Sequence, residues 1–496
     1  MKKNVFKFLM ATAVMSLTFG CSEDYISQEP QGGVITLDQL ADAASVNPDI
    51  VGGTMDGVYT TTFSTGTGGT GGHDDFGMKG YDIFSDMLSG DMALSLSTYG
   101  WYRASITELQ CTQDFTYTDN YQVWRHYYRV IKNSNIVIGT LGGADAVPVV
   151  EASRHILGQA LTMRAHSYFY LTQFMSRDYY PDAEILPIYD ETTNTGQPKS
   201  TTNEVYAFME NDLNSAISLL DGFNRPTKTQ VNKPVAQAVL AYVLASKRNA
   251  WPQVASLTAD VMATNGASLM SAAEVTGGFN NVATPGWFWG VDLTVDIGLG
   301  LVSWWGQMDY FSYSYPAFGD SKSIDENLYN AIAADDARKA QFYTTAGSLY
   351  LMPLDKFYDD DRVPAGASST VTADYVYMRQ AEMILLNAEA LAKSGQDGPA
   401  REMLRSLMSQ RIPDTSYLNA LSGVALQDEI YLQTRIELWG EGKSYLALKR
   451  NQGTVNRGDN HLSFVGVPMS YDDERLTFEI PEQELQDNIF ISEQNQ

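Results

Sequence analysis

The chain has 496 residues, of which 44% are hydrophobic and 19% are charged. This length suits one large domain or several lobes, and the composition is that of a globular protein, neither disordered nor membrane-embedded. The 59 acidic residues outnumber the 33 basic ones, which gives a formal net charge of −26. Because such a surface repels phosphate backbones and anionic membranes, nucleic acid and acidic lipid surfaces are disfavoured as partners.

The first twenty residues have the pattern of a bacterial export signal. Three lysines precede an apolar run at 8–19 that is too short to cross a bilayer as a helix. Gly20 then stands directly before Cys21, as the lipoprotein signal peptidase requires. We therefore expect residues 1–20 to be removed and Cys21 to carry a lipid anchor. An ordinary secretory signal is the alternative, because Thr18 and the bulky Phe19 depart from the usual lipoprotein pattern.

A polar tether is expected at residues 21–34, between the lipid and the folded body. Its acidic start, Ser22-Glu23-Asp24, is similar to the export tag of surface-exposed lipoproteins. The expected location is thus the outer membrane, lipid-anchored and exposed at the cell surface. The only other cysteine is Cys111, which has no Cys or His neighbour in sequence and is interpreted as a buried apolar side chain.

Helical periodicity dominates the N-terminal region, 35–260. Apolar residues recur at helical spacing within 154–175, 201–220 and 235–248, and Thr201 with Glu204 forms a capping box at the start of the second segment. Successive helices of this kind predict a mainly α fold, an α-helical solenoid with tetratricopeptide-like helix pairs, long irregular loops and a few short strands.

Residues 261–372 differ in composition, because glycine, asparagine, threonine and aromatic residues replace the helical pattern. We expect a loop-rich region that rests on the helical scaffold, with a β-like run at 287–294. Helical periodicity returns in the C-terminal region, 373–496, with a helix expected at 375–393 and a short strand at 476–480.

No sequence motif for catalysis or a cofactor withstands inspection. The glycines of 66–71 fit the dinucleotide fingerprint, but the residues after them do not begin a helix as that motif requires, so a loop is expected. The five histidines show no zinc spacing. Acidic clusters at 359–361 and 472–474 could hold a structural calcium ion, although solvated loops are the preferred interpretation. No cofactor is expected.

Aromatic side chains gather between 286 and 318, where ten occur and where Arg and Lys are absent. Aromatic rings cover the apolar faces of sugars, and an anionic ligand would find no counter-charge in this segment. A second aromatic group occurs at 99–103. The alternative for each ring is burial in the core. The candidate ligand-binding residues are Trp101, Tyr102, Trp304, Trp305, Tyr310 and Tyr313.

Several stretches of the chain resemble, in order, segments of the SusD/RagB family of nutrient-binding surface lipoproteins. The resemblance lies in 124–138 (WRHYYRVIKNSNIVI), 158–187, 202–220, 287–292 (WFWGVD), 377–390, 435–450 and 478–485. Two positions depart from the family pattern, since Thr434 and Lys443 stand where arginines are usual. The resemblance implies a helical fold with tetratricopeptide pairs, a partner barrel and no reaction chemistry. The family's binding residues vary, so none is carried over.

The expected function is that of a cell-surface lipoprotein that binds an oligosaccharide or polysaccharide. By resemblance, it would deliver this glycan to a partner TonB-dependent transporter of the SusC-like kind and would not be an enzyme. Two alternatives remain: a binder of oligopeptides or other nutrients on the same scaffold, and a surface glycoside hydrolase. The second cannot be judged from sequence, because the separation of paired carboxylates is spatial.

Overall fold

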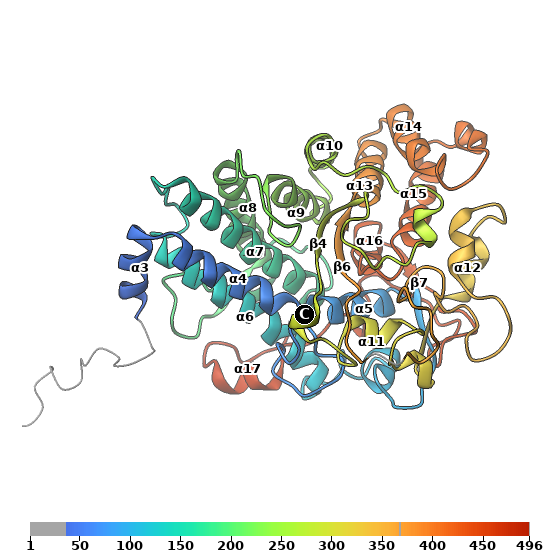
Figure 1. Cartoon of the computed structure of the whole chain (residues 1–496), viewed down its shortest axis with the longest axis horizontal. Helices are drawn as coiled ribbons and strands as arrows, with labels where there is room; N and C mark the ends of the chain where they lie inside the picture. The colour runs from blue at the N-terminus through green and yellow to red at the C-terminus, as the bar shows by residue number, and fades with distance from the viewer. Residues whose placement is uncertain (1–35, 367–368, 496) are drawn as a thin grey trace, which may run out of the picture.

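The computed structural model describes residues 36–366 and 369–495 (Figure 1). Within these ranges the chain is mainly helical, and its short strands occur in pairs. This confirms the expected fold class. The expected signal peptide, Cys21 and the tether lie outside the described residues. In the part of the chain that is described, no helix has the length and apolar content needed to span a membrane.

The N-terminal helices pack against their neighbours in chain order (Figure 1). Contacts join α6 to α7, α7 to α8, α8 to α9 and α9 to α10, while α4 lies against α6 and α7. This serial packing is the expected tetratricopeptide-like arrangement. The helices are α3 (Leu37–Val46), α4 (Asp49–Phe63), α6 (Thr118–Thr140), α7 (Glu151–Met175), α8 (Thr202–Leu219), α9 (Lys233–Ser246) and α10 (Trp251–Thr264).

Helix α7 is the centre of this region, because nearly every side chain from Leu157 to Met175 is buried. Close approach of α8 depends on Gly158, where an added Cβ would lie 2.7 Å from Leu220 Cγ. The capping box predicted for α8 is present. The Glu204 backbone N–H donates to Thr201 Oγ1 at 3.3 Å, and the Thr201 N–H donates to Glu204 Oε2 at 2.8 Å.

The C-terminal helices continue the packing, since α13 lies against α10 and then against α14 and α15 (Figure 1). Helix α5 contacts α16 and so joins the two regions. These and the remaining helices are α5 (Met78–Leu88), α11 (Trp304–Met308), α12 (Glu326–Ala331), α13 (Gln380–Lys393), α14 (Asp397–Met408), α15 (Gly423–Glu437), α16 (Ser444–Arg450) and α17 (Glu482–Asp487).

In the described residues, four antiparallel strand pairs lie among the helices. Strand β1 (Met92–Leu96) pairs with β5 (Ser321–Ile324), and β2 (Glu184–Pro187) pairs with β3 (Lys199–Thr201). Strand β4 (Trp287–Val291) pairs with β6 (Tyr375–Arg379), and β7 (Thr454–Val455) pairs with β8 (Met469–Ser470). The β-like run expected from residue 287 is therefore present as β4.

Two sequence-based predictions, one helix boundary and one strand, are corrected by the structure. The helix expected over 375–393 begins only at Gln380, because 375–379 form β6. This strand is fully buried and pairs with β4 through backbone hydrogen bonds. The strand expected at 476–480 is absent from the described pairs. This segment gains only isolated backbone bonds, such as Phe478 N–H to Phe174 O at 2.8 Å, and so has no strand partner.

A buried ion network ties the C-terminal elements together. Glu437 accepts hydrogen bonds from Arg338 at 3.1 Å, from Arg379 at 2.7 Å and from Arg411 at 2.8 Å. Each of these side chains is almost completely enclosed. Burial alone would raise the pKa of Glu437, but the surrounding arginines hold it well below its usual range. The carboxylate is therefore a fixed negative charge at the junction of α15, β6 and the 336–342 segment.

Candidate functional site

Two loops from distant parts of the sequence meet at one place on the surface. Because β1 pairs with β5, the residues that follow β1 lie beside the residues that precede β5. The contact is fixed by Asp320, whose Oδ1 accepts the backbone N–H groups of Thr98 at 2.5 Å and Tyr99 at 2.9 Å. The two aromatic segments that the sequence singled out are thus brought together.

The meeting point carries a cluster of four rings, His73, Tyr99, Trp101 and Tyr315, which we call the aromatic platform. His73 and Trp101 stack with their centroids 5.1 Å apart and their planes only 3° from parallel. The edge of Tyr315 packs on all three partners, at 5.8 Å from His73, 6.1 Å from Trp101 and 5.5 Å from Tyr99. Tyr315 Oη and His73 Nδ1 share a hydrogen bond of 2.5 Å. Tyr99 is 58% exposed, His73 and Trp101 are half-buried and Tyr315 is buried, so the platform reaches solvent mainly through Tyr99.

A glycine-rich loop, residues 66–72, delivers His73 to the platform. Asp75 accepts from the backbone N–H groups of Gly68 at 2.7 Å and Thr70 at 3.0 Å. The loop crosses α6 so closely that a Cβ on Gly68 would lie 2.5 Å from Gln122 Cβ. The N–H groups that would bind a phosphate are therefore occupied by the carboxylate of Asp75, in agreement with the rejection of the dinucleotide motif.

A cavity of about 300 Å³ lies beside Trp101. Its polar wall includes Asp74 and Asp119, with Tyr102 nearby. Burial and the neighbouring Asp119 raise the pKa of Asp74 well above its usual range, and burial also raises the pKa of Asp119. The raised pKa values favour a proton on the pair, and a pair that holds one proton offers both a donor and acceptors. The lining residues are Thr70, Gly71, Gly72, Asp74, Gly100, Trp101, Tyr102, Ala104, Ser105, Tyr117, Thr118, Asp119 and Gln122.

The platform and the cavity together suit a polyhydroxylated ligand. Flat rings cover C–H faces, and the carboxyl pair can both donate to and accept from hydroxyl groups. No group of three or more His, Cys, Asp or Glu side chains in the described ranges is arranged to hold a metal. In the acidic clusters considered for calcium, Asp473 forms an ion pair of 2.6 Å with Arg475, and Asp360 Oδ1 accepts a hydrogen bond of 2.7 Å from Asn280.

Three of the six predicted ligand-binding residues are corrected by their burial. Trp304 and Trp305 are 2% and 1% exposed, because Ser303 caps the short helix α11 and both indoles turn inward. Trp304 packs on Phe357 at 4.7 Å. Tyr102 is 1% exposed and belongs to the wall of the cavity, not to the platform. The two indoles have no free face for a ligand.

The other three predicted residues reach the surface in part. Trp101 belongs to the platform, and Tyr313 is 46% exposed with Phe318 at 5.7 Å. Tyr310 contacts Phe311 rather than the platform. The platform also includes His73 and Tyr315, which the sequence did not single out for binding. Tyr315 belonged to the aromatic run, but His73 carried no signal beyond its position in a glycine loop.

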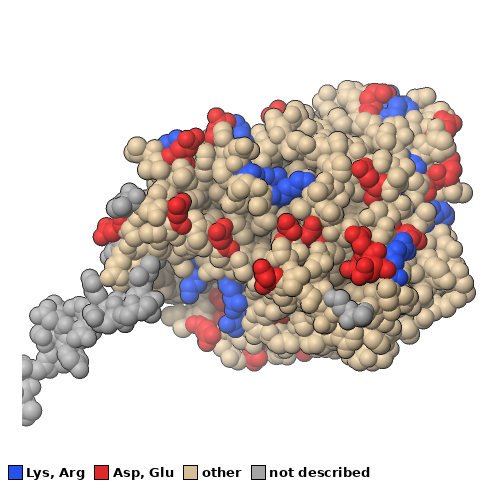
Figure 2. Space-filling model, viewed as in Figure 1, with Lys and Arg blue, Asp and Glu red and all other residues tan. Residues whose placement is uncertain are grey.

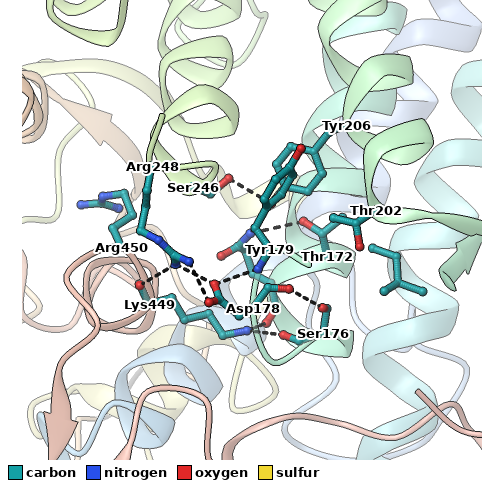
Figure 3. A pocket seen from close by; sticks show the side chains of 12 residues that line it. Thr172, Ser176, Asp178, Tyr179, Thr202, Tyr206, Ser246, Arg248, Lys449 and Arg450 are labelled. Atoms are coloured by element: carbon teal, nitrogen blue, oxygen red, sulfur yellow. Dashed lines mark hydrogen bonds and ion pairs between the residues drawn. The ribbon is translucent and has the colours of Figure 1, made fainter. Parts of the chain in front are cut away.

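A second, enclosed polar pocket lies between α7, α8, α9 and α16 (Figure 3). Its interior space is only about 10 Å³, which is room for about one water molecule. Figure 3 shows why: Arg248 forms two hydrogen bonds with Asp178, at 2.6 and 2.7 Å, and Lys449 reaches the carbonyl of Ser176 at 2.5 Å. This pocket is a structural junction and does not admit a ligand.

Comparison with known proteins agrees with this geometry. Residues 81–244 match a family model described as "Starch-binding associating with outer membrane", and residues 282–489 match the SusD family. The chain belongs to the SusD/RagB-like family. Among curated proteins, none matched significantly.

Solved structures with the same fold cover most of the chain. A SusD-like carbohydrate binding protein from Bacteroides vulgatus is 25% identical, with a TM-score of 0.75 over 89% of this chain and 96% of that one. A SusD superfamily protein from Bacteroides fragilis is 23% identical, with a TM-score of 0.71 over 90% and 99%. Surface glycan-binding protein A from Bacteroides thetaiotaomicron, in complex with laminarihexaose, is 13% identical, with a TM-score of 0.66 over 90% and 99%.

One of the family segments noted in the sequence, 435–450, takes part in the buried ion network. The 435–450 segment carries Glu437 and Glu441, and Glu441 accepts from Arg379 at 2.6 Å and from Lys356 at 3.0 Å. Lys443, which replaces the usual arginine, lies 3.8 Å from Glu382. Lys443 therefore keeps an ionic contact at its position, whereas Thr434 donates only to its own helix, to Ile430 O at 2.8 Å.

Proposed function

We propose that the protein is a glycan-binding lipoprotein of the cell surface, which captures an oligosaccharide or polysaccharide on the aromatic platform. The observation that carries this proposal is the half-buried stack of Trp101 and His73, with the exposed Tyr99 in the same cluster and a hydrogen-bonding cavity beside it. Ring stacking provides affinity for a sugar face, and the Asp74–Asp119 pair provides partners for its hydroxyl groups.

The platform is built for binding and not for turnover. Asp74 and Asp119 lie against each other within one wall, whereas glycoside hydrolysis needs two carboxyl groups on opposite sides of a bond. Family membership also favours a binding protein. We therefore propose that the protein releases its ligand unchanged.

Delivery to a TonB-dependent transporter of the SusC-like kind completes the proposal. It rests on the family resemblance and on the expected anchor at Cys21, and it assigns the protein to the outer face of the outer membrane. A protein that presents its ligand to a transporter gains from a tether, because attachment to the same membrane raises the effective concentration of one partner near the other.

The platform is tested by replacing Trp101 with alanine and measuring binding to neutral polysaccharides by affinity gel electrophoresis. Loss of one stacking ring should weaken binding by about tenfold or more, which corresponds to about 1.4 kcal/mol. Tyr180→Ala, which removes an exposed ring in the loop after α7, is the matched control and should bind as the parent does. Equal retardation of the parent and Trp101→Ala would refute the platform. Calorimetry with oligopeptides in place of glycans tests the alternative nutrient.

Lipid attachment is tested separately in cells. Radiolabelled palmitate should be incorporated into the parent chain and not into Cys21→Ala. The acyl chains are expected on the Cys21 thiol and on the Cys21 amino group that removal of residues 1–20 exposes. The variant should also leave the membrane fraction. Label retained by Cys21→Ala would contradict the anchor without affecting the platform.

A further inference from the structure

An open cavity of about 820 Å³ lies on a different part of the scaffold from the platform. Its walls are the loop between α8 and α9, the first residues of α9 and the end of α10. Three basic residues, Arg225, Lys228 and Lys233, line it together with Phe223 and with two acidic residues, Asp221 and Asp260, so the basic side chains outnumber the acidic ones. Figure 2 shows that basic side chains gather near the middle of the visible face, on a surface where acidic side chains are otherwise widespread.

Arg225 and Lys228 are held in place by backbone carbonyls instead of carboxylates. Arg225 donates to Gln230 O at 2.8 Å and also to Phe288 O. Lys228 Nζ donates to Val282 O at 2.6 Å. Among the described residues, neither cation has a carboxylate within the 4.0 Å of an ion pair, although the chain has 59 acidic residues. These bonds fix both side chains before any ligand arrives, which lowers the entropy that binding would cost.

The two cations are unfavourable neighbours without an anion. Burial lowers the pKa of Arg225 to about 10. Burial, and then the charge of Arg225, also lowers the pKa of Lys228. The third cation, Lys233, is paired with Asp221 at 2.7 Å, but both side chains are solvent-exposed, and such a pair contributes little and is readily exchanged. An anionic group placed between Arg225 and Lys228 would relieve this repulsion.

The size and remaining lining of the cavity point to an organic anion. A space of about 820 Å³ exceeds what an inorganic ion fills and matches the size range of small-molecule sites. Phe223 offers an apolar face, while Asn224 and Gln237 offer amide groups for hydroxyls. Planar carboxylates and sulfates suit the donor fork of an arginine.

We infer that the Arg225–Lys228 cavity is a second ligand site, which binds the carboxylate or sulfate group of an acidic sugar. This rests on the proposed glycan-binding function for the ligand class, but it uses none of the platform residues. The protein would then recognise glycans at two places, one by ring stacking and one by charge.

Calorimetry with defined oligosaccharides tests the site. The probes are trigalacturonate, its methyl ester, a chondroitin sulfate hexasaccharide and sodium sulfate. The parent should bind at least one of the two acidic sugars and should not bind the uncharged ester at this site. Arg225→Gln and Lys228→Gln should each weaken that binding by about tenfold, the loss expected for one charge-assisted hydrogen bond.

Arg154→Gln is the matched control, because Arg154 also donates only to backbone carbonyls, those of Pro148 at 3.2 Å and Val149 at 2.8 Å, outside the cavity. It should bind as the parent does. If Arg225→Gln does not fold, the affinity of Lys228→Gln for the acidic sugars tests the site by itself. Four outcomes would each overturn the inference. They are that the parent binds neither acidic sugar, that Arg154→Gln loses as much affinity as the cavity variants, that the methyl ester binds as tightly as trigalacturonate, or that sulfate is the only probe that binds. Trp101→Ala should keep the acidic binding, so failure of the platform is distinguishable from failure of this site.

Discussion

At the scale of single residues, the protein shows how buried charges are made tolerable. Glu437 is enclosed with three arginines, and every one of these cations has a carboxylate or carbonyl acceptor. Buried ion pairs of this kind contribute modestly as a whole, since their attraction must offset a large desolvation cost. The energetic consequence of removing a single member is much larger, because its partners stay buried without a counter-charge.

Glu437→Gln should therefore destabilise the fold by about 3–5 kcal/mol. Urea unfolding followed by circular dichroism measures this change. Glu402→Gln is the control, because Glu402 lies 71% exposed at 3.4 Å from Arg405, and exposed pairs contribute about 0–1 kcal/mol. If the two variants unfold at the same urea concentration, the network has no special role in stability.

Elements whose signals are local could be predicted from the sequence. Helical periodicity and the Thr201–Glu204 capping box located α7, α8 and α9, because a helix satisfies its own backbone and leaves a pattern in a single segment. The 287–294 run likewise predicted β4. By contrast, 375–379 reads as the start of a helix, since its strand partner lies about 90 residues earlier and leaves no mark in the local pattern.

The site shows the same limit at the level of loops. Aromatic composition found Trp101 and Tyr313, but it could not separate rings that stack at the surface from rings that turn inward. Ser303 fixes the orientation of Trp304 and Trp305. Its side chain accepts a hydrogen bond from the Gly306 N–H at 3.0 Å and so begins the short helix in which both indoles are buried. His73 was missed because its contact with Trp101 depends on a loop crossing α6, which no pattern within residues 66–73 reveals.

At the scale of the whole molecule, buried ionisable groups link stability to pH. Burial lowers the pKa of Lys449 to about 7, while an unfolded lysine titrates near 10.4. Between these values the unfolded chain binds a proton at this residue that the folded chain does not bind. The free energy of unfolding therefore rises with pH across this window, and it falls as the pH decreases toward 7.

Lys449→Met should remove this contribution. Over pH 7.5–9.5 the parent's unfolding free energy should rise faster than that of Lys449→Met, by up to about 1.4 kcal/mol for each pH unit. Comparing the two chains cancels the effects of Asp86 and Cys111, whose pKa values burial raises and which act in the opposite direction. Guanidinium unfolding at three pH values measures the slopes. Parallel slopes would show that Lys449 keeps its proton in the fold.

The joining of the platform's two loops through Asp320 has a consequence for biogenesis. Tyr99 and Asp320 are 221 positions apart, so the proposed sugar-stacking surface cannot form until the polypeptide has been made well past its midpoint and strands β1 and β5 have paired. A truncated or partly threaded chain would lack it altogether. An immobilised polysaccharide would thus retain complete, correctly folded molecules. It would not retain truncated or partly exported chains.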